Sequence, residues 1–448
     1  MRILASCLLV VLFGIGGAEA ESPQPSMNRF DWTSDLDYLY AEIQTTHPAV
    51  YHKTPKADMD AYVAQLRAEI PGESWPRYVM GLYGLLAKVG DGHTTFFPMP
   101  DAGPGFDTRY PILPQVFSDG AYIVATDPRY ASTLGGRIVA INGQSMANVF
   151  RGIAEHWGHE NDMWPLRWLP FALRRPGYLA GTGIIGDVAS PTNFTIEKSG
   201  KFQNVTIAPV SADADAGGQQ NTWLHGRDEG ALPQPLIGPG VPFDFVYLKE
   251  HNTVYVVYNQ CADGEKETVA QFAARLFAFV IATNPDRLII DLRNNGGGDN
   301  TVNQPLLAGM TSSTLANRPG HLFVLVGRQT FSAAQDFANA AERTTQALFV
   351  GEPTGSAPNA WGDPKQFTLP KTGLHPMVAT RYWQDSDPND RRVAILPDVP
   401  AAQSFADWMA GRDPVLEAAL AFRSDAQAVS TAPRWQRSSQ TGILPLPF

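Results

Sequence analysis

Apolar side chains recur at helical spacing between residues 30 and 97. They lie three and four residues apart in three groups: Leu36, Leu39, Tyr40 and Ile43; Met59, Tyr62, Val63 and Leu66; and Tyr78, Leu82, Leu85 and Leu86. Side chains at this spacing share one face of an α-helix and can pack against a neighbouring helix. The pattern predicts an N-terminal helical domain at residues 21–100, built as a bundle of three or four helices.

Between residues 101 and 210 the apolar residues form short runs that are typical of strands. The runs at 194–196 and 205–207 flank Gly200 and predict a hairpin. Residues 135–145, which read Gly-Gly-Arg-Ile-Val-Ala-Ile-Asn-Gly-Gln-Ser, resemble the closing half of a PDZ-type module. We therefore expect a β-rich, partly PDZ-like middle region at residues 101–210.

Aromatic residues gather within this region, at Trp157, Trp164, Trp168 and Phe171. Such a cluster is more often part of a hydrophobic core than of a binding surface. It can also form the wall of a substrate groove that takes apolar side chains. Both interpretations stay open at this point.

Residues 211–221 are small, polar and aperiodic, which is typical of a linker or flexible loop. We expect this linker to extend over residues 211–242. From 243 to 423 apolar runs of strand length alternate with helical patterns, with strands expected at 245–247, 254–257, 288–292, 322–326 and 348–350 and helices at 268–281, 303–309, 333–341 and 414–422. This alternation predicts an α/β domain with mostly parallel strands.

The composition is that of a globular protein, with 448 residues, 44% hydrophobic residues and a net charge of -10. The length is too great for one ordinary core and suggests two or three domains. The negative charge disfavours nucleic acid as a partner. Beyond the N-terminal segment no apolar run reaches the ~18 residues that a spanning helix needs, so stable membrane insertion is not expected.

The N-terminal residues 1–20 have the pattern of a secretory signal peptide. Arg2 precedes an apolar run at 3–17, and Ala18-Glu19-Ala20 fits a cleavage site. The mature protein is therefore expected to be secreted or periplasmic. Residues 424–448 are polar and contain proline, which predicts a flexible tail.

His47 and His52 are the residues that invite a metal site. On a helix their spacing would set them about 140° apart. Pro48 also disfavours helical backbone at His47, and no third ligand stands nearby. We expect neither a metal nor a cofactor.

The clearest chemical signal lies between residues 286 and 355. A strand at 288–293 runs into Asn294-Asn295-Gly296-Gly297-Gly298, and a second strand at 322–326 leads through a turn to Ser332 and a helix of small residues. The first amides of a helix have no intrahelical partner, so they can hold an oxyanion beside the serine. Glycines allow a second backbone N–H group to approach the same point. Taken alone, a serine at this position is usually an N-cap and three glycines are usually a turn.

Three motifs together resemble the tail-specific protease family of serine peptidases (peptidase family S41). They are Leu-Ile-Ile-Asp-Leu-Arg-Asn-Asn-Gly-Gly-Gly at 288–298, Thr-Phe-Ser-Ala-Ala-Gln-Asp-Phe at 330–337 and Gly-Glu-Pro-Thr-Gly at 351–355. The resemblance implies a crotonase-like or Clp-protease-like β-α superhelix at residues 243–423. It also implies Ser332 as the nucleophile, with the backbone amides of Gly297 and Ala333 as the oxyanion hole; Gly298 is nearly as plausible as Gly297.

One branch of that family uses a lysine after the Gly-Glu-x-Thr turn as the base, and residues 355–360 contain no lysine. The tricorn-like branch uses an earlier histidine, and Val-Gly-Asp-Gly-His-Thr-Thr at 89–95 resembles its motif. This resemblance implies His93 as the general base. The branch also orients its histidine with a serine before it and a distant glutamate, which Gly92 and Asp390 replace here.

The identity of the group that orients His93 therefore stays open in the sequence. Asp390 is our candidate, Asp385 and Asp387 are alternatives, and an enzyme with a reduced relay is another. We interpret Glu352 as a structural residue.

The expected function is hydrolysis of peptide bonds in peptides or unfolded proteins by a serine endopeptidase. Two alternatives remain: a non-catalytic member of the fold that binds a retinoid-like or lipid-like ligand, and a serine esterase that uses the same site. The residues do not indicate an oligomeric state.

Overall fold

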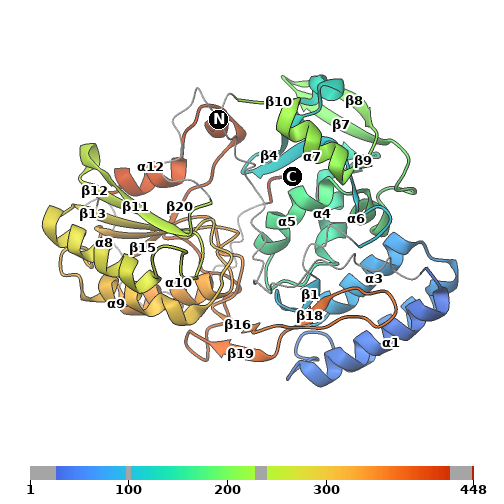
Figure 1. The fold of residues 1–448 in the computed structure, drawn as a ribbon, viewed down its shortest axis with the longest axis horizontal. Helices are drawn as coiled ribbons and strands as arrows, with labels where there is room; N and C mark the ends of the chain where they lie inside the picture. The colour runs from blue at the N-terminus through green and yellow to red at the C-terminus, as the bar shows by residue number, and fades with distance from the viewer. Residues whose placement is uncertain (1–26, 97–101, 228–239, 424–445) are drawn as a thin grey trace.

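The computed structural model describes residues 27–96, 102–227, 240–423 and 446–448. The predicted signal peptide and most of the predicted tail lie outside these residues. The described chain forms two lobes, one holding the N-terminal helices and the β-rich region and the other an α/β sheet (Figure 1). A group of short strands joins the lobes at one side (Figure 1).

Three helices occupy the segment in which the sequence predicts a helical bundle. They are α1 (Arg29–Thr46), α2 (Lys56–Glu69) and α3 (Trp75–Ala87). The apolar face of α1 is buried through Leu36, Leu39 and Ile43, as its spacing predicts. Helix α3 is buried on almost every side because it packs against α1, α2 and the later helix α6 (Pro176–Gly181).

The middle region is built on a seven-stranded sheet with the order β10-β4-β5-β7-β8, to which β3 and β6 are added at β4 and β5. Its strands are β3 (Ile112–Phe117), β4 (Gly120–Thr126), β5 (Arg137–Ile141), β6 (Gln144–Ser145), β7 (Thr192–Lys198), β8 (Lys201–Ile207) and β10 (Leu224–His225). Helices α4 (Met146–Ala154) and α5 (Met163–Leu173) interrupt the strands and pack with α6. The hairpin expected around Gly200 is present as β7 and β8.

The segment expected to be a loop at 211–221 is instead helix α7 (Ala212–Asn221). Ser211 caps the helix by accepting a hydrogen bond from the Ala214 N–H group. Asp215 lies in the first turn, where a negative charge suits the helix dipole, and it pairs with Arg174 at 2.5 Å. The Ser211 cap and the Asp215–Arg174 ion pair thus stabilise a helix whose residues have low helical propensity. Neither interaction can be recognised from the spacing of apolar residues.

The second lobe is an α/β unit, as the alternation of strands and helices predicts. Its six-stranded sheet has the order β11-β12-β13-β14-β15-β20, with β11 antiparallel to β12 and the remaining pairs parallel. The strands are β11 (Phe243–Leu248), β12 (Thr253–Tyr258), β13 (Arg287–Asp291), β14 (Leu322–Val326), β15 (Leu348–Gly351) and β20 (Val399–Pro400). The helices are α8 (Val269–Thr283), α9 (Gln304–Ser312), α10 (Ala333–Thr344) and α12 (Pro414–Ala421). The short helix α11 (Phe405–Met409) packs instead on β3 and β4 of the middle region.

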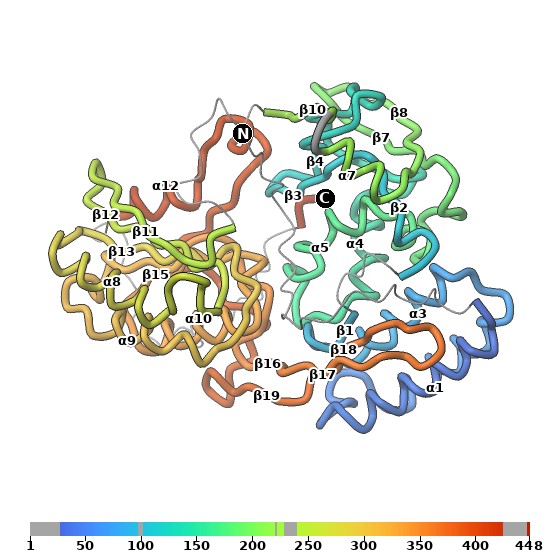
Figure 2. The backbone as a smooth tube through the Cα atoms, viewed as in Figure 1, coloured from blue at the N-terminus to red at the C-terminus, as the bar shows by residue number. Residues whose placement is uncertain are grey.

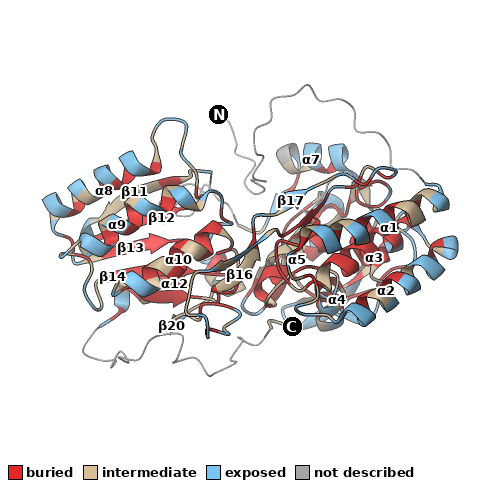
Figure 3. Ribbon diagram, turned by 90° about the horizontal axis from the view of Figure 1, so that it is seen from below, coloured by how far each residue is buried: buried red, intermediate tan, exposed pale blue. Residues whose placement is uncertain are grey.

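The central strands of this sheet are buried on both faces (Figure 3). Leu288, Ile290 and Val324 point to the face covered by α8, α9 and α10, whereas Ile289 and Phe323 point to the face covered by α12. Parallel strands that are covered on both sides read as continuous apolar runs, which explains the sequence of β13 and β14. The carboxyl ends of these strands carry the loops that follow.

A long excursion of the C-terminal lobe reaches the N-terminal helices. It contains β16 (Asn359–Gly362) paired with β19 (Arg381–Gln384), and β17 (Lys365–Gln366) paired with β18 (Pro376–Val378). Strand β18 also pairs with β1 (Thr95–Phe96), so that Thr95 and Met377, which are 282 positions apart (377 - 95), are partners in one small sheet. Figure 2 shows β1, β17 and β18 side by side.

Asp35 on α1 holds the tip of this excursion. Its side chain is fully buried and accepts hydrogen bonds from the Lys371 N–H group, the Thr372 N–H group and the Thr372 hydroxyl at 3.0, 2.7 and 2.6 Å. A buried carboxylate that satisfies two backbone donors fixes the loop against α1.

Asp35→Asn should lower the free energy of unfolding by about 3 kcal/mol, because the amide cannot accept all three hydrogen bonds and buried donors lose their partner. Urea unfolding followed by tryptophan fluorescence measures the change. Asp58→Asn, on an exposed position of α2, is the matched control and should change it by less than about 1 kcal/mol. Equal effects of the two substitutions would contradict the role given to Asp35.

Candidate active site

Ser332 lies at the turn that joins β14 to α10. Its backbone has φ 53° and ψ -131°, which places a side-chain-bearing residue in the left-handed half of conformational space. Such a conformation costs about 1–3 kcal/mol and persists only where the surroundings enforce it. The hydroxyl makes no capping hydrogen bond with α10, unlike that of an ordinary N-cap serine. The strained turn therefore presents the hydroxyl away from its own helix.

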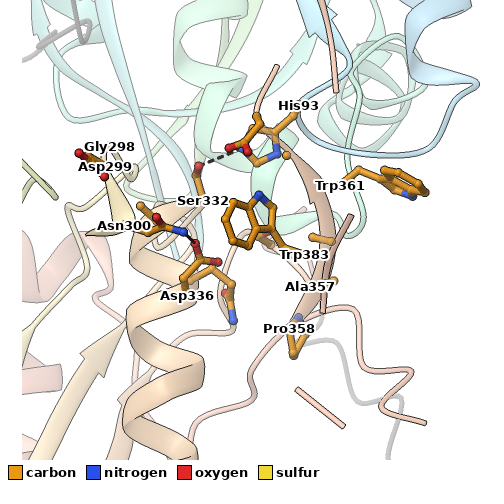
Figure 4. Close-up of a pocket in the computed structure, with 16 residues that line it drawn as sticks. His93, Gly298, Asp299, Asn300, Ser332, Asp336, Ala357, Pro358, Trp361 and Trp383 are labelled. Carbon is orange, nitrogen blue, oxygen red and sulfur yellow. Dashed lines mark hydrogen bonds between the residues drawn. The ribbon is translucent and has the colours of Figure 1, made fainter. Parts of the chain in front are cut away.

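His93 meets this hydroxyl from the other lobe. It lies in the turn before β1, and its Nε2 atom is 3.0 Å from Ser332 Oγ (Figure 4). At this distance neutral imidazole can accept the hydroxyl proton. The structure thus brings together the two residues that the sequence indicated as nucleophile and base, although 239 positions separate them.

An aromatic stack holds the imidazole in place. The rings of His93 and Phe331 are 4.6 Å apart, and Phe331 stacks on Trp164 at 3.8 Å. A Cβ atom at Gly92 would lie 2.7 Å from the Phe331 ring. The family's serine before the histidine therefore has no space here, since Phe331 occupies it.

Burial lowers the pKa of His93 below its ordinary value, while the Asp91 carboxylate, the Trp361 backbone and Asp363 oppose that shift. The imidazole is consequently neutral at pH 7, which is the form that a base requires. Its Nδ1 atom is buried, and its interaction is with the Trp361 backbone rather than with a side chain of the described residues. The arrangement is a serine–histidine pair without a carboxylate hydrogen-bonded to the imidazole.

Asp91 is a contributor that the sequence reasoning missed. Its Oδ1 atom accepts hydrogen bonds from the N–H groups of His93 and Thr94 at 3.0 and 2.7 Å. Its Oδ2 atom lies 3.4 Å from Nε2 of His47. Because His47 Nδ1 accepts from the Ala49 N–H group, the proton of His47 is on Nε2, facing Asp91. The Asp-Gly-His-Thr sequence carried the signal, since an aspartate commonly accepts from the N–H group two residues later.

Glu160 completes this buried group. Its Oε1 atom accepts a hydrogen bond from the Gly92 N–H group at 3.2 Å. Burial and the nearby Asp91 raise the pKa of Glu160 to about 8. Glu160 is therefore mostly neutral at pH 7.

Asp390 is not brought to His93. Its carboxylate, 4% exposed as a residue, accepts hydrogen bonds from Ser386 and from both the backbone and the guanidinium of Arg392. Arg392 in turn binds Glu342 at 2.7 Å. The Asp390 carboxylate is thus part of a buried ion-pair network with Arg392 and Glu342, and it does not contact the His93 imidazole. Glu352 likewise pairs with Arg328, at 2.5 Å.

The glycine run approaches Ser332 closely, but the N–H group of Gly297 is already used. Asn295 Oδ1 accepts a hydrogen bond from it at 2.9 Å. Gly297 has φ 109°, and a Cβ atom there would lie 2.7 Å from Ser332 Cβ, so only glycine fits. Gly298 and Ala333 line the cavity in front of Ser332, and the structure shows no acceptor for either N–H group among the described residues. The expectation for Ala333 fits this geometry, whereas Gly298 fits it better than Gly297.

The cavity beside Ser332 has a volume of about 220 Å³. It is formed by the start of α10, the loop at 298–300, the turn at 356–358 and the β16–β19 pair. On the opposite side of His93, Trp157, Trp164 and Trp168 enclose a smaller apolar cavity with Phe331. The aromatic cluster therefore belongs to the core and also borders the site. In the described part of the chain, no group of three or more His, Cys, Asp or Glu residues is arranged to hold a metal ion.

The fold resembles solved structures of CPAF. One, a serine-to-alanine mutant, superposes with a TM-score of 0.58 at 13% identity, over 91% of this chain and 100% of that chain. Mature CPAF in complex with lactacystin has a TM-score of 0.54 at 14% identity, over 88% and 97% of the two chains. No protein-family model matches the sequence, and a search of the curated proteins finds no match.

This similarity extends over both lobes and concerns the fold, since the sequences have diverged to 13–14% identity. It confirms the α/β architecture that the three sequence motifs imply. In the described ranges, no helix combines the length and apolar character needed to cross a bilayer.

The rate at which a fluorophosphonate labels Ser332 should fall as the pH is lowered, and the midpoint of this pH–rate profile should lie below pH 6.5. Protonated imidazole cannot accept the hydroxyl proton, and burial holds the pKa of His93 below the ~6.5 of free histidine. Labelling rates measured from pH 4.5 to 8 give the midpoint. A midpoint above 6.5 would contradict this environment for His93.

The same shift affects stability. Between the lowered pKa of His93 and about 6.5 the unfolded chain binds the proton more readily, so stability falls as the pH drops through this window. His93→Gln, which does not titrate, should lose less stability than the wild type between pH 7 and pH 5 in urea unfolding.

Asp91→Asn should shift the labelling midpoint to lower pH and reduce the maximal rate by roughly tenfold. The amide still accepts from the His93 N–H group, but the negative charge that raises the pKa of His93 is lost. Asp58→Asn serves again as the control. An unchanged midpoint with a reduced rate would show that Asp91 acts only through structure.

Proposed function

We propose that this chain is a serine peptidase of the tail-specific protease family, histidine-base branch, which hydrolyses peptide bonds in peptides or unfolded protein segments. The observation that carries the proposal is the 3.0 Å contact between His93 Nε2 and Ser332 Oγ in front of the N-terminus of α10. The fold shared with CPAF supports it. The superhelical arrangement of the second lobe and the PDZ-like character of the middle region are parts of the same proposal.

The first half-reaction forms an acyl-enzyme. Ser332 Oγ attacks the carbonyl carbon while its proton passes to His93 Nε2, and the carbonyl π electrons move to the oxygen. The N–H groups of Ala333 and Gly298 hold the resulting oxyanion, each contributing about 3–4 kcal/mol to lowering the barrier. His93 then returns the proton to the leaving amine as the C–N bond breaks. Water completes the cycle by the same steps and releases the acid.

Gly298 takes the place that the family resemblance gave to Gly297. A donor that already bonds to Asn295 at 2.9 Å would have to exchange that partner for the oxyanion, whereas Gly298 lines the cavity and its N–H group has no acceptor among the described residues. Gly297 then serves to let the glycine loop lie directly against Ser332.

Asp91 takes the positioning role in place of Asp390. It fixes the backbone of His93 by a hydrogen bond and favours the imidazolium by its charge. Phe331 fixes the ring plane. The reaction therefore uses the Ser332–His93 dyad. The Asp91 carboxylate assists it by a hydrogen bond to the His93 backbone and by its electrostatic effect on the imidazole.

We propose an extracytoplasmic location, secreted or periplasmic, on the strength of residues 1–20. Peptides or unfolded proteins are the expected partners, and the acidic net charge argues against nucleic acid.

Purified wild-type protein should be labelled by a fluorophosphonate and should degrade unfolded casein. Ser332→Ala should lose labelling and reduce casein cleavage by at least about 10³-fold, because the nucleophile is absent. His93→Gln should reduce both, since the hydroxyl then has no base.

The outcomes separate three functions. Absence of labelling in the wild type, or equal labelling of Ser332→Ala, would eliminate the hydrolase and favour a ligand-binding protein. Turnover of a p-nitrophenyl ester without any cleavage of casein would assign an esterase.

A further inference from the structure

The cavity beside Ser332 is acidic. Asp299, Asp336 and Asp363 line it, and no lysine or arginine is among the described residues that do. The nearest positive group is Arg381 at the rim, 3.9 Å from Asp363 with both side chains more than half exposed. A long separation in water leaves that pair weak. The deeper carboxylates thus have no cationic side chain beside them in the cavity.

Asp336 occupies the inner wall. It lies four residues after Ser332 on α10, so both side chains are on one face of the turn. Its Oδ2 atom accepts a hydrogen bond from Asn300 Nδ2 at 2.9 Å (Figure 4). Burial and the adjacent Asp385 raise the pKa of Asp336 to about 8. Two neighbouring carboxylates ionise together only beside a cation.

Gln335 gives an independent indication of the missing group. It lines the cavity, is 2% exposed, and its Oε1 atom has no hydrogen-bond partner in the part of the chain that the structure describes. The orientation of the amide is set by its neighbours: Asn339 Nδ2 donates to the Pro358 carbonyl, so Asn339 Oδ1 must accept from Gln335 Nε2. The atom left over is therefore an acceptor that needs an N–H donor.

Asp385 lies beside Asp336, and a hydrogen bond joins the two carboxyl groups. The unpaired acceptor of Gln335 fits a ligand group that carries only donors. Guanidinium and ammonium groups have this property, with five and three N–H donors and no acceptor. Trp383 also lines the cavity, between Ser332 and Asp336 in Figure 4, and the Arg381 guanidinium lies over its ring, 3.8 Å from the ring centroid. Since this ring packs on one guanidinium, it suits the stem of a second basic side chain.

We propose that this cavity is a specificity subsite for a positively charged substrate side chain, so that the protein cleaves next to arginine or lysine. The proposal deepens the peptidase function and rests on it. Asp336 binds the cation with Asp385 hydrogen-bonded to it, Gln335 Oε1 accepts one of the N–H groups, and Trp383 lies beside the stem. The bound side chain places its neighbouring peptide bond at Ser332 Oγ.

The test compares two fluorescent peptides of seven residues, alanine at every position except the centre, which is arginine in one and its neutral isostere citrulline in the other. Binding is measured by fluorescence polarisation with full-length Ser332→Ala, which retains the cavity and cannot turn the peptide over. We expect at least about tenfold tighter binding of the arginine peptide. The wild type should show a similar ratio in kcat/KM, with cleavage next to arginine in mass spectra.

Asp336→Asn, made in both backgrounds, should reduce the arginine preference to within about threefold, because the amide cannot ionise beside the bound cation but retains an acceptor for Asn300. Asp385→Asn provides a second variant in case the first does not fold. Glu265→Gln, an exposed position before α8, removes the same charge elsewhere and should leave the preference unchanged.

Equal binding of the two peptides, or an arginine preference that survives both aspartate substitutions, would overturn the subsite. If the arginine peptide binds selectively to Ser332→Ala while the wild type neither cleaves it nor reacts with a fluorophosphonate, the subsite stands and the peptidase function fails. Cleavage of both peptides at equal rates would leave the peptidase and remove the subsite.

Discussion

The site depends on the pairing of β1 with β18. His93 and Ser332 belong to different lobes, and an imidazole on a free loop would rarely stay within hydrogen-bonding distance of a hydroxyl in the other lobe. The pairing of Thr95 with Met377, the bond from the Ala379 N–H group to Thr94 Oγ1, and the hold of Asp35 on the loop tip tie the segment beside His93 to the C-terminal lobe. The chemistry thus depends on a few hydrogen bonds that do not involve the reacting atoms themselves.

Around Ser332 the structure enforces a backbone that serine alone would avoid. Gly297 packs against Ser332 Cβ, and the Phe331 N–H group donates to the Asn295 carbonyl at 3.3 Å, so the glycine loop and the turn support one another. The resulting φ of 53° turns the hydroxyl from a cap into an exposed group. Strain of this kind is tolerated where the neighbouring structure over-determines it, and here two strand ends do so.

The sequence predicted the α/β fold and indicated Ser332 and His93, because short motifs and apolar periodicity are local properties. It did not reveal which amide is free, since that depends on the Asn295 side chain folding back onto Gly297. It pointed to Asp390, whose carboxylate is held by Arg392 two residues away. It gave Asp91 no role, although this residue lies in the quoted motif, because a contact through the backbone leaves no charge pattern to read.

The acidic surroundings of the site account for the absence of a hydrogen-bonded third residue. During attack His93 becomes an imidazolium, which burial disfavours and which Asp91 and Asp363 both favour. Asp91 lies behind the histidine and Asp363 lines the cavity in front of it, so the charge is stabilised from two sides although no carboxylate of the described residues is hydrogen-bonded to Nδ1. A carboxylate directly on Nδ1 would raise the pKa further and leave more of the histidine protonated at rest. A moderate field from several aspartates keeps the base neutral before the reaction and still stabilises its charged form during it.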